Sequence, residues 1–126
     1  MEAVTDTGCP GRHPVLVVED DPDIRECERL VLEQEGFDVV TAANGAEAEE
    51  ELLQMGRPCL VLLDLMMPVM SGWELLDHLR KNGSLKRGLH VVVMSASSTK
   101  GLEGAVAVMR KPVRIDKLIE MVHRWC

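Results

Sequence analysis

Short apolar runs alternate with amphipathic segments along the chain, and this alternation restricts the fold more than any other feature of the sequence. Five apolar runs are typical of buried strands: residues 14–20, 37–42, 59–65, 90–96 and 105–111. Four segments repeat apolar residues at helical spacing: 21–36, 44–56, 72–83 and 114–125. Because strands joined by helices need crossover connections, the pattern predicts a parallel sheet covered on both faces.

The number and length of the strands favour a doubly wound α/β fold. Five strands of this size suit the flavodoxin-like order 2-1-3-4-5, in which ligands bind outside the carboxyl ends of the strands. The segment between the last two strands, "SSTKGLEG", is rich in Ser and Gly and a poor helix former. We therefore expect the fourth helix of such a fold to be shortened or lost.

The first helix has recognisable signals at both ends. Asp21 is a suitable N-cap with Pro22 at the first helical position, and Gly36 fits just beyond the last turn. Apolar residues at helical spacing define the face that we expect to pack on the sheet. They are Ile24, Cys27, Leu30 and Val31.

Length and composition limit the class of protein. At 126 residues the chain has the length of one domain. Residues 1–13 lack periodicity and are interpreted as a flexible N-terminal tail, which leaves 14–126 as the domain. No apolar run approaches membrane-spanning length and no signal peptide is recognisable, so a cytoplasmic location without membrane attachment is expected. A net charge of −7 disfavours nucleic acid as the main partner.

Cys27 and Cys59 are interpreted as core residues, and the cysteine spacing indicates no disulfide framework.

Polar residues interrupt the apolar pattern where four of the strands end. They are Glu19 and Asp20 after the first strand, Asp64 at the third, Ser95 at the fourth and Lys111 at the fifth. In the expected strand order these side chains surround one small volume. Two close carboxylates repel by roughly 4 kcal/mol at an effective dielectric of 20, so either protons are retained or a cation offsets the charge. Mg²⁺ prefers such oxygen ligands, and the group is suited to stabilise a phosphoryl group beside one carboxylate.

Four short motifs carry a resemblance to a known family. They are "VLVVEDD", "LLDLMMPVMSG", "MSA" and "RKP", in this order within residues 14–125. With these motifs the chain resembles a response-regulator receiver domain of two-component signalling. The resemblance implies a single-domain response regulator that accepts a phosphoryl group and passes the signal on by protein contact. Such a protein catalyses its own phosphorylation and slow dephosphorylation without being a conventional enzyme.

The resemblance implies a role for each member of the acidic cluster. Asp64 would be the phosphoacceptor, which takes the phosphoryl group from a histidine kinase or a histidine phosphotransfer protein to form an aspartyl phosphate. Asp20 would bind Mg²⁺ directly, and Glu19 would hold it mostly through water. Asp64 and the backbone carbonyl of Met66 would complete the protein ligands of the metal.

The residues around the cluster have implied roles as well. Lys111 would pair with a phosphoryl oxygen, and Ser95 would move to bond another one, which is the switching event in this family. Pro112 would follow a cis peptide bond that directs Lys111 inward. Ala96 is small and would leave the approach to the phosphoryl group open.

Two departures from the family pattern concern the readout of the signal. The family usually carries Tyr or Phe three positions before the lysine, and here that position is Val108. The shortened fourth helix removes part of the surface at which many receivers dimerise or dock. The resemblance therefore implies the phosphorylation chemistry but does not identify the readout or the downstream target.

Alternatives to the phosphoacceptor remain open at this point. One is a non-phosphorylated pseudo-receiver that serves as an interaction scaffold, and another is a receiver fragment of a hybrid kinase. A phosphohydrolase of the haloacid-dehalogenase type would need a second acid two residues after the nucleophile, where this chain has Met66. For recognition of a kinase, the first helix offers Arg25 and Glu28 as candidates.

Overall fold

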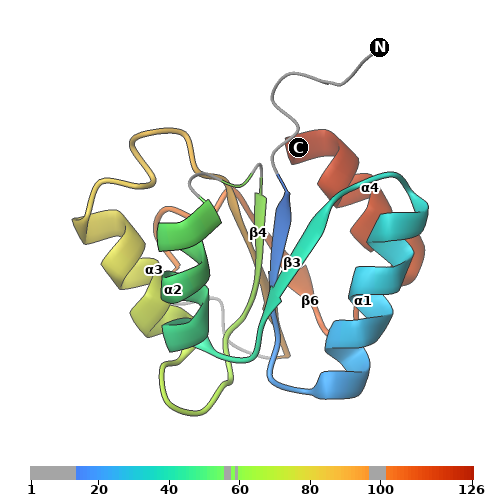
Figure 1. The fold of residues 1–126 in the computed structure, drawn as a ribbon, viewed down its shortest axis with the longest axis horizontal. Coiled ribbons are helices and arrows are strands. Elements are labelled where there is room, and N and C mark those ends of the chain that lie inside the picture. Colours follow the sequence, from blue (N-terminus) through green and yellow to red (C-terminus); the bar gives the residue numbers. More distant parts are fainter. Residues whose placement is uncertain (1–13, 56–57, 59, 97–101) are drawn as a thin grey trace.

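The chain alternates strands and helices as the sequence predicts (Figure 1). The computed structural model describes residues 14–55, 58, 60–96 and 102–126. In chain order the elements are β2 (Val15–Val18), α1 (Pro22–Gln34), β3 (Val39–Ala42), α2 (Gly45–Met55), β4 (Leu60–Asp64), α3 (Gly72–Lys81), β5 (Val91–Ser95), β6 (Ala107–Arg110) and α4 (Ile115–Trp125). The predicted tail, residues 1–13, and the predicted core residue Cys59 lie outside the described residues.

All five strands are parallel and form one sheet with the order β3-β2-β4-β5-β6. Numbered along the chain this order is 2-1-3-4-5, which confirms the predicted doubly wound α/β fold. The register aligns the carboxyl ends of neighbouring strands, because Val18 lies opposite Leu63 and Asp64 lies opposite Met94. The connections of β2 and β4 lead away in opposite directions along the sheet, so the switch in strand order falls between these two strands.

Helices cover both faces of the sheet. α1 and α4 lie on one face and α2 and α3 on the other (Figure 1). Among the described residues, none of the helices is long and apolar enough to cross a membrane. Every residue of β2, β4 and β5 is buried, as expected for parallel strands between helix layers. The cluster under α2 and α3 includes Leu63, Leu75, Leu76, Leu79 and Val93, and the cluster under α1 and α4 includes Val17, Leu32, Leu62, Leu118 and Val122.

The buried face of α1 differs from the prediction. Its buried residues are Glu28 and Leu32, whereas Ile24 is 41% and Leu30 46% exposed. Cys27 is also exposed, so its assignment to the core is wrong. A helix with apolar residues on two neighbouring faces can turn either one inward, and packing against β2 and α4 selects the face with Leu32. The burial of Glu28 also contradicts its proposed role as a surface contact for a kinase.

The connection between β5 and β6 contains no helix in its described residues, 96 and 102–106, which agrees with the predicted loss of the fourth helix. Its consequence is visible on β6. Ala107 and Met109 pack toward α1 and α4, so Val108 points to the opposite face by the alternation of a strand. On that face Val108 is 41% exposed.

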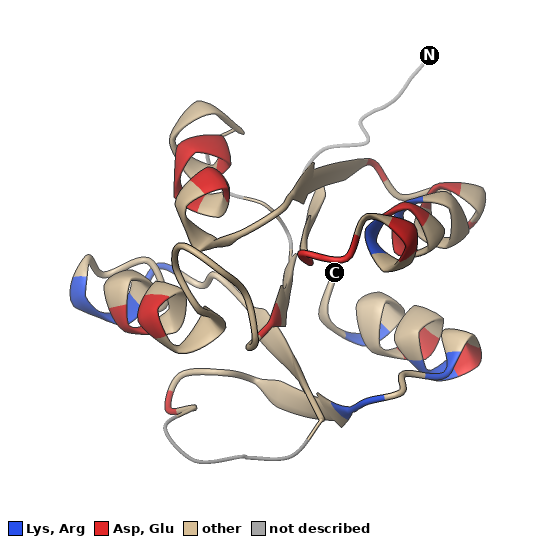
Figure 2. Ribbon diagram, turned by 90° about the horizontal axis from the view of Figure 1, so that it is seen from below, with Lys and Arg blue, Asp and Glu red and all other residues tan. Residues whose placement is uncertain are grey.

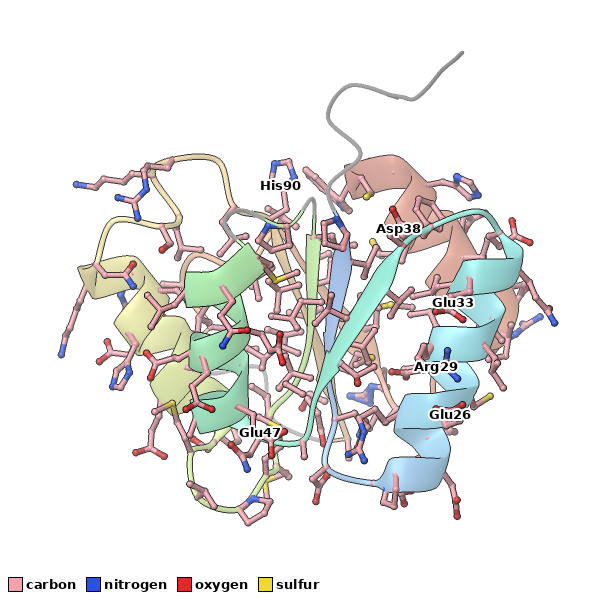
Figure 3. All side chains as sticks on the ribbon, in the orientation of Figure 1. Glu26, Arg29, Glu33, Asp38, Glu47 and His90 are labelled. Atoms are coloured by element: carbon pink, nitrogen blue, oxygen red, sulfur yellow. The ribbon has the colours of Figure 1, made fainter. Side chains whose placement is uncertain are left out.

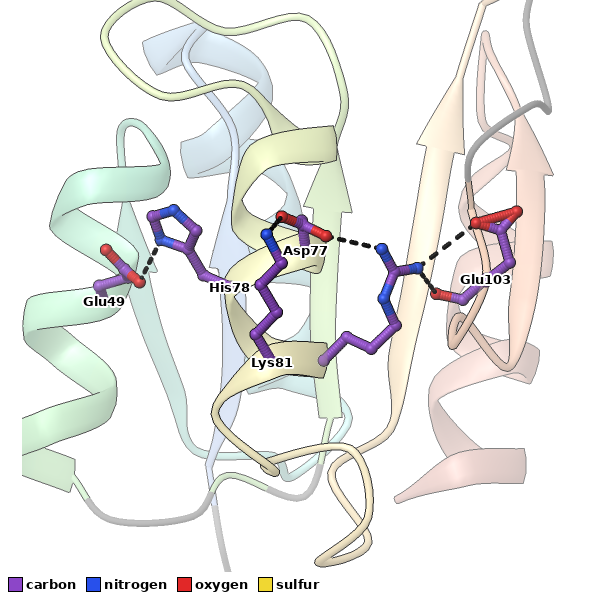
Figure 4. A network of polar contacts seen from close by, with 6 residues as sticks. Glu49, Asp77, His78, Lys81 and Glu103 are labelled. Atoms are coloured by element: carbon purple, nitrogen blue, oxygen red, sulfur yellow. Dashed lines mark hydrogen bonds and ion pairs between the residues drawn. The ribbon is translucent and has the colours of Figure 1, made fainter.

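A surface network ties α3 to its neighbours (Figure 4). The guanidinium of Arg80 lies 2.6 Å from Asp77 on the same helix and 3.4 Å from the carboxylate of Glu103 before β6. His78 Nδ1 lies 2.8 Å from Glu49 of α2. Because these groups are solvent-exposed, water and salt screen each pair and weaken its contribution to stability. The network therefore orients the helices more than it stabilises them.

The end of α4 is anchored beside the start of β5. His90 Nδ1 lies 3.1 Å from the carbonyl oxygen of Trp125, and the two rings meet edge to face with centroids 5.2 Å apart. Figure 3 shows His90 at the end of the sheet opposite to the carboxyl ends of the strands. Cys126 is disulfide-bonded, a feature that the cysteine spacing did not indicate.

Candidate functional site

Three carboxylates meet where β2 and β4 end, at the switch in strand order. Glu19, Asp20 and Asp64 each place one oxygen within 4.8 Å of the other two. Glu19 is 1% and Asp64 3% exposed, whereas Asp20 is open to solvent. Figure 2 looks onto this edge of the sheet, and acidic segments at the ends of neighbouring strands converge near its centre. The sequence predicted this acidic cluster, and the structure contains it.

Lys111 supplies the positive charge of the pocket. Its Nζ lies 3.0 Å from Asp64 Oδ1 and 3.3 Å from Glu19 Oε1. The backbone N–H of Lys111 donates to the carbonyl of Ser95 at 2.8 Å, which extends the pairing of β5 and β6. The peptide bond between Lys111 and Pro112 is cis. Burial alone would lower the pKa of Lys111, but its hydrogen bond and ion pair with Asp64, aided by Glu19, raise that pKa above its usual value.

The surroundings of Glu19 oppose its ionisation. Burial, followed by the negative charge of Asp64, raises the pKa of Glu19 to about 7. The backbone N–H of Asp21, which donates to Glu19 Oε2 at 3.2 Å, and the charge of Lys111 act in the opposite direction without outweighing these effects. A cation bound by the three carboxylates would offset their repulsion. The residues therefore fit a hard divalent cation such as Mg²⁺.

Arg25 fixes the backbone that carries Glu19 and Asp20. Its Nη1 donates to the carbonyl oxygen of Glu19 at 2.8 Å and lies 3.5 Å from that of Asp20. The contact joins the first turn of α1 to the end of β2. From the sequence, Arg25 was predicted only as a candidate for kinase recognition. Its contact with the backbone was not predicted, because no local motif signals a side chain that reaches back over the strand–helix turn.

The segment after Asp64 contains a strained turn. Val69 has a φ of 68°, in the left-handed region that β-branched residues rarely adopt. The N–H of Met70 donates to the carbonyl of Pro68 at 2.7 Å, which closes a three-residue γ-turn around Val69. Such strain persists only where the surrounding structure imposes it, and it is common at functional sites.

Gly72 allows α3 to begin very close to the end of β4. Its N–H donates to the carbonyl of Leu65 at 2.9 Å, and a Cβ at this position would come within 2.5 Å of the carbonyl oxygen of Asp64. Only glycine permits this approach. Neither Gly72 nor the strained Val69 was predicted from the sequence. The Ser-Gly pair before an amphipathic segment marks a helix start but does not reveal a backbone contact.

Ser95 and its neighbours complete the strand ends. Ser95 is 8% exposed and follows Met94, the residue paired with Asp64 across the sheet. Ala96, next in the chain, is exposed. The side chain of Met66, two residues after Asp64, is 70% exposed. The structure thus places the predicted residues at adjacent strand ends, and their chemical roles remain predictions.

Comparison with known proteins shows the family. The sequence matches the response regulator receiver domain over residues 15–123, and the chain belongs to this family. It is 36% identical over 118 residues to the DNA-binding response regulator MtrA of Mycolicibacterium smegmatis, which covers 89% of this chain and 50% of that protein. It is 35% identical over 120 residues to an uncharacterized 14.6 kDa protein of Leptolyngbya boryana, which covers 89% of this chain and 88% of that protein. The chain therefore spans about half the length of the DNA-binding regulator.

Solved receiver structures have the same fold. The response regulator TrrA from Thermotoga maritima, in complex with Mg²⁺-BeF, superposes with a TM-score of 0.79 at 32% identity, over 90% of this chain and 99% of that one. A CheY-like receiver domain protein from Methanospirillum hungatei gives a TM-score of 0.75 at 30% identity, over 87% of this chain and 90% of that one.

Proposed function

We propose that this protein is a phosphoacceptor of a two-component or phosphorelay system. Asp64 accepts a phosphoryl group from the phosphohistidine of a histidine kinase or a histidine phosphotransfer protein, in the presence of Mg²⁺. The observation that carries the proposal is the position of Asp64. It is 3% exposed, ends a fully buried strand and lies beside two further acids and Lys111. Burial of such a carboxylate is costly, which argues for a function.

The side chains of the pocket have complementary tasks in this reaction. A carboxylate oxygen of Asp64 attacks phosphorus, the bond from phosphorus to the histidine nitrogen breaks, and the imidazole keeps the electron pair. Lys111, 3.0 Å from Asp64, is placed to bind an oxygen of the incoming phosphoryl group and to offset its charge. Ser95 offers a hydroxyl group from the neighbouring strand end to a second oxygen, while the small Ala96 leaves the approach open.

The acids provide the metal site that this reaction needs. Glu19, Asp20, Asp64 and the backbone carbonyl of Met66 would hold Mg²⁺, which when bound neutralises charge on the transferred group. Glu19 must give up its proton to take part, and its pKa is about 7, so occupancy depends on pH near neutrality. That TrrA, a relative at 32% identity, was crystallised with Mg²⁺-BeF supports this assignment.

The wider role follows from the phosphoacceptor. A phosphorylated form would pass its signal to a downstream protein target in the cytoplasm, and Val108 in place of the family aromatic implies a different readout. The relative MtrA is a DNA-binding response regulator, but it extends beyond the part matched here. DNA binding is therefore not carried over to this chain.

Intact-mass spectrometry after incubation with acetyl phosphate and Mg²⁺ tests the proposal. Wild type should gain one phosphoryl group, and Asp64→Asn should gain none. Asp77→Asn is the matched control, because it removes an exposed acid of α3 that is ion-paired with Arg80 and Lys81. This control should be phosphorylated like wild type, and omission of Mg²⁺ should abolish the gain in both.

The folding of Asp64→Asn must be checked beside its chemistry. Because the substitution removes one of three repelling carboxylates, we expect thermal unfolding in metal-free buffer at the wild-type temperature or above. If folded wild type gains a phosphoryl group neither from acetyl phosphate nor from a histidine kinase, the result favours the scaffold function.

A further inference from the structure

The first residue of α2 is a glycine that is required by lack of space. Gly45 is buried and belongs to the regular helix, where alanine would be the better helix former. A Cβ at this position would come within 2.7 Å of Met70 Cγ and within 2.9 Å of the Met70 carbonyl oxygen. Nonbonded carbon atoms normally stay about 3.5–4.0 Å apart. Only glycine therefore allows the segment after β4 to approach α2 so closely.

A hydrogen bond joins the same two segments. The backbone N–H of Gly45 donates to the carbonyl oxygen of Met70 at 3.1 Å. The first N–H groups of a helix have no partner within that helix, and the partial positive charge at its N-terminus attracts a carbonyl oxygen. Figure 3 shows Glu47, in the first turn of α2, at the end of the molecule where this segment also lies. Met70 thus caps α2, and the start of α2 in turn holds Met70.

The segment held in this way is the β4–α3 loop, residues 65–71, which follows Asp64. Its base is fixed by the hydrogen bond from Gly72 to the carbonyl of Leu65, and its far side is fixed by Met70 against Gly45. Between these points the side chains of Met66 and Val69 are 70% and 81% exposed. The contact with α2 therefore determines the path of a loop whose middle is largely open to solvent.

The geometry points to Gly45 as a positioning residue of the cation site. It acts through Met70 on the β4–α3 loop, and it thereby sets the position of the Met66 backbone carbonyl. The inference rests on the proposed function, because Met66 is a ligand only if the pocket binds Mg²⁺. This cation requires nearly ideal octahedral geometry, so a small displacement of one ligand weakens its binding.

Gly45→Ala tests the inference directly. Its new methyl group must push Met70, and the loop with it, away from α2. Residues that orient metal ligands typically change metal affinity 10–100-fold when they are substituted, so we expect about tenfold weaker binding of Mg²⁺. Isothermal calorimetry with Mg²⁺ alone measures the affinity of wild type and variant.

Asn44→Ala is the matched control. The Asn44 side chain accepts a hydrogen bond from the backbone N–H of Glu47 at 2.9 Å, so its loss weakens the start of the same helix. It places no new atom against Met70 and should bind Mg²⁺ like wild type. Urea unfolding records the stability of both variants. Equal Mg²⁺ affinity of Gly45→Ala and wild type, or an equal loss in Gly45→Ala and Asn44→Ala, would overturn the inference.

A second measurement uses wild type alone and decides the matter even if Gly45→Ala does not fold. If the contact between Gly45 and Met70 favours Mg²⁺ binding, bound Mg²⁺ must stabilise that contact to the same extent. Hydrogen exchange of the Gly45 amide, followed by NMR, should therefore slow about tenfold at saturating Mg²⁺ relative to that of the Glu47 amide. The Glu47 amide is bonded to Asn44 and reports the general stabilisation of the helix start. An equal change at both amides would reject the inference.

Phosphorylation by acetyl phosphate is measured separately, so that failure of the proposed function is recognised as such. If wild type binds Mg²⁺ and is labelled on Asp64 but Gly45→Ala binds equally well, the proposed function stands and Gly45 has no positioning role. If Gly45→Ala binds Mg²⁺ more weakly but no protein is labelled, the role of Gly45 stands and the phosphoacceptor proposal fails. If wild type binds no Mg²⁺, the proposed cation site is wrong and the inference falls with it.

Discussion

Two strand–helix units meet at the pocket, β2 with α1 and β4 with α3, and they share one plan. Each strand is buried along its whole length, and acids stand at its end. Each helix then starts at a side-chain cap. Asp21 accepts hydrogen bonds from two backbone N–H groups of α1, and Ser71 forms a capping box with Glu74 at α3.

The units differ in what they place against the sheet. α3 buries three leucines and Gly72, whereas α1 buries one leucine and Glu28. The segment before α3 also contains the strained γ-turn at Val69, and a short acidic turn precedes α1. Firm apolar packing can hold a strained loop beside Asp64, whereas the α1 unit buries a carboxyl group where an apolar side chain would pack. If Asp64 is the proposed phosphoacceptor, the unit with the more apolar helix face is the one that presents it.

The largest expected effect tests the packing of α3. Leu79 is 2% exposed, so Leu79→Ala removes buried methyl groups and leaves a cavity, at a cost of about 2–5 kcal/mol in the free energy of unfolding. Leu53→Ala is the control, because Leu53 of α2 is 86% exposed and its loss should change stability by less than about 0.5 kcal/mol. Urea unfolding measures both. Equal, small losses would break the comparison, since α3 would not depend on its leucines.

On the inner face of α1 the sign should reverse. Glu28→Leu replaces an unpartnered buried carboxyl group by an apolar side chain, so the protein should gain about 1–3 kcal/mol in metal-free buffer at pH 8. The same urea unfolding experiment, repeated across pH, measures the gain.

The pH dependence identifies the cause of this gain. The pKa of Glu28 is about 7 in the folded protein against an ordinary 4.5, so between these values the native state keeps a proton that the unfolded state has lost. Wild-type stability due to Glu28 is therefore present at low pH and falls as pH rises through about 7. Leucine does not titrate, and the advantage of the variant should shrink toward pH 5. A gain that is independent of pH would mean that the pKa of Glu28 is the same in the folded and the unfolded protein.

The two strand–helix units also show which features of the fold and the site can be predicted from the sequence. The apolar runs predicted all five strands, and parallel strands bring their carboxyl ends to one edge, so Glu19, Asp20, Asp64 and Lys111 were predicted to meet. That inference needs only strand order and chain direction. Local signals also sufficed for the cap of α1 at Asp21.

Properties that depend on packing could not be predicted in this way. α1 carries apolar residues on two neighbouring faces. The sequence predicted burial of the face with Ile24 and Cys27, whereas the buried face contains Glu28 and Leu32. Which face turns inward is decided by contacts with β2 and α4. The left-handed Val69 and the backbone contact of Gly72 likewise arise from tertiary constraints, and residue type alone does not signal them.

A smaller effect tests the strained turn that only the β4–α3 unit contains. Glycine adopts a φ of 68° without steric cost, so Val69→Gly should stabilise the protein by about 1 kcal/mol after the entropy of glycine is deducted. Val108→Gly is the matched control. That residue lies in a regular strand, and its replacement should lower stability by about 1 kcal/mol. Opposite signs in urea unfolding would support strain at Val69, whereas a loss in both variants would show that the turn is not strained.

The smallest effect concerns the feature that the two units share. Asp21→Ala and Ser71→Ala each remove an N-cap, and each should lower the free energy of unfolding by about 0.5–1 kcal/mol. Arg114→Ala serves as the control, because Arg114 precedes α4 without a side-chain cap and should cost less. Similar losses for the first two variants would show that the units begin alike and differ only in their inner faces and loops. A much larger loss for Ser71→Ala would place part of the difference at the helix start, since the cap would then also be holding the strained segment after Asp64 in place.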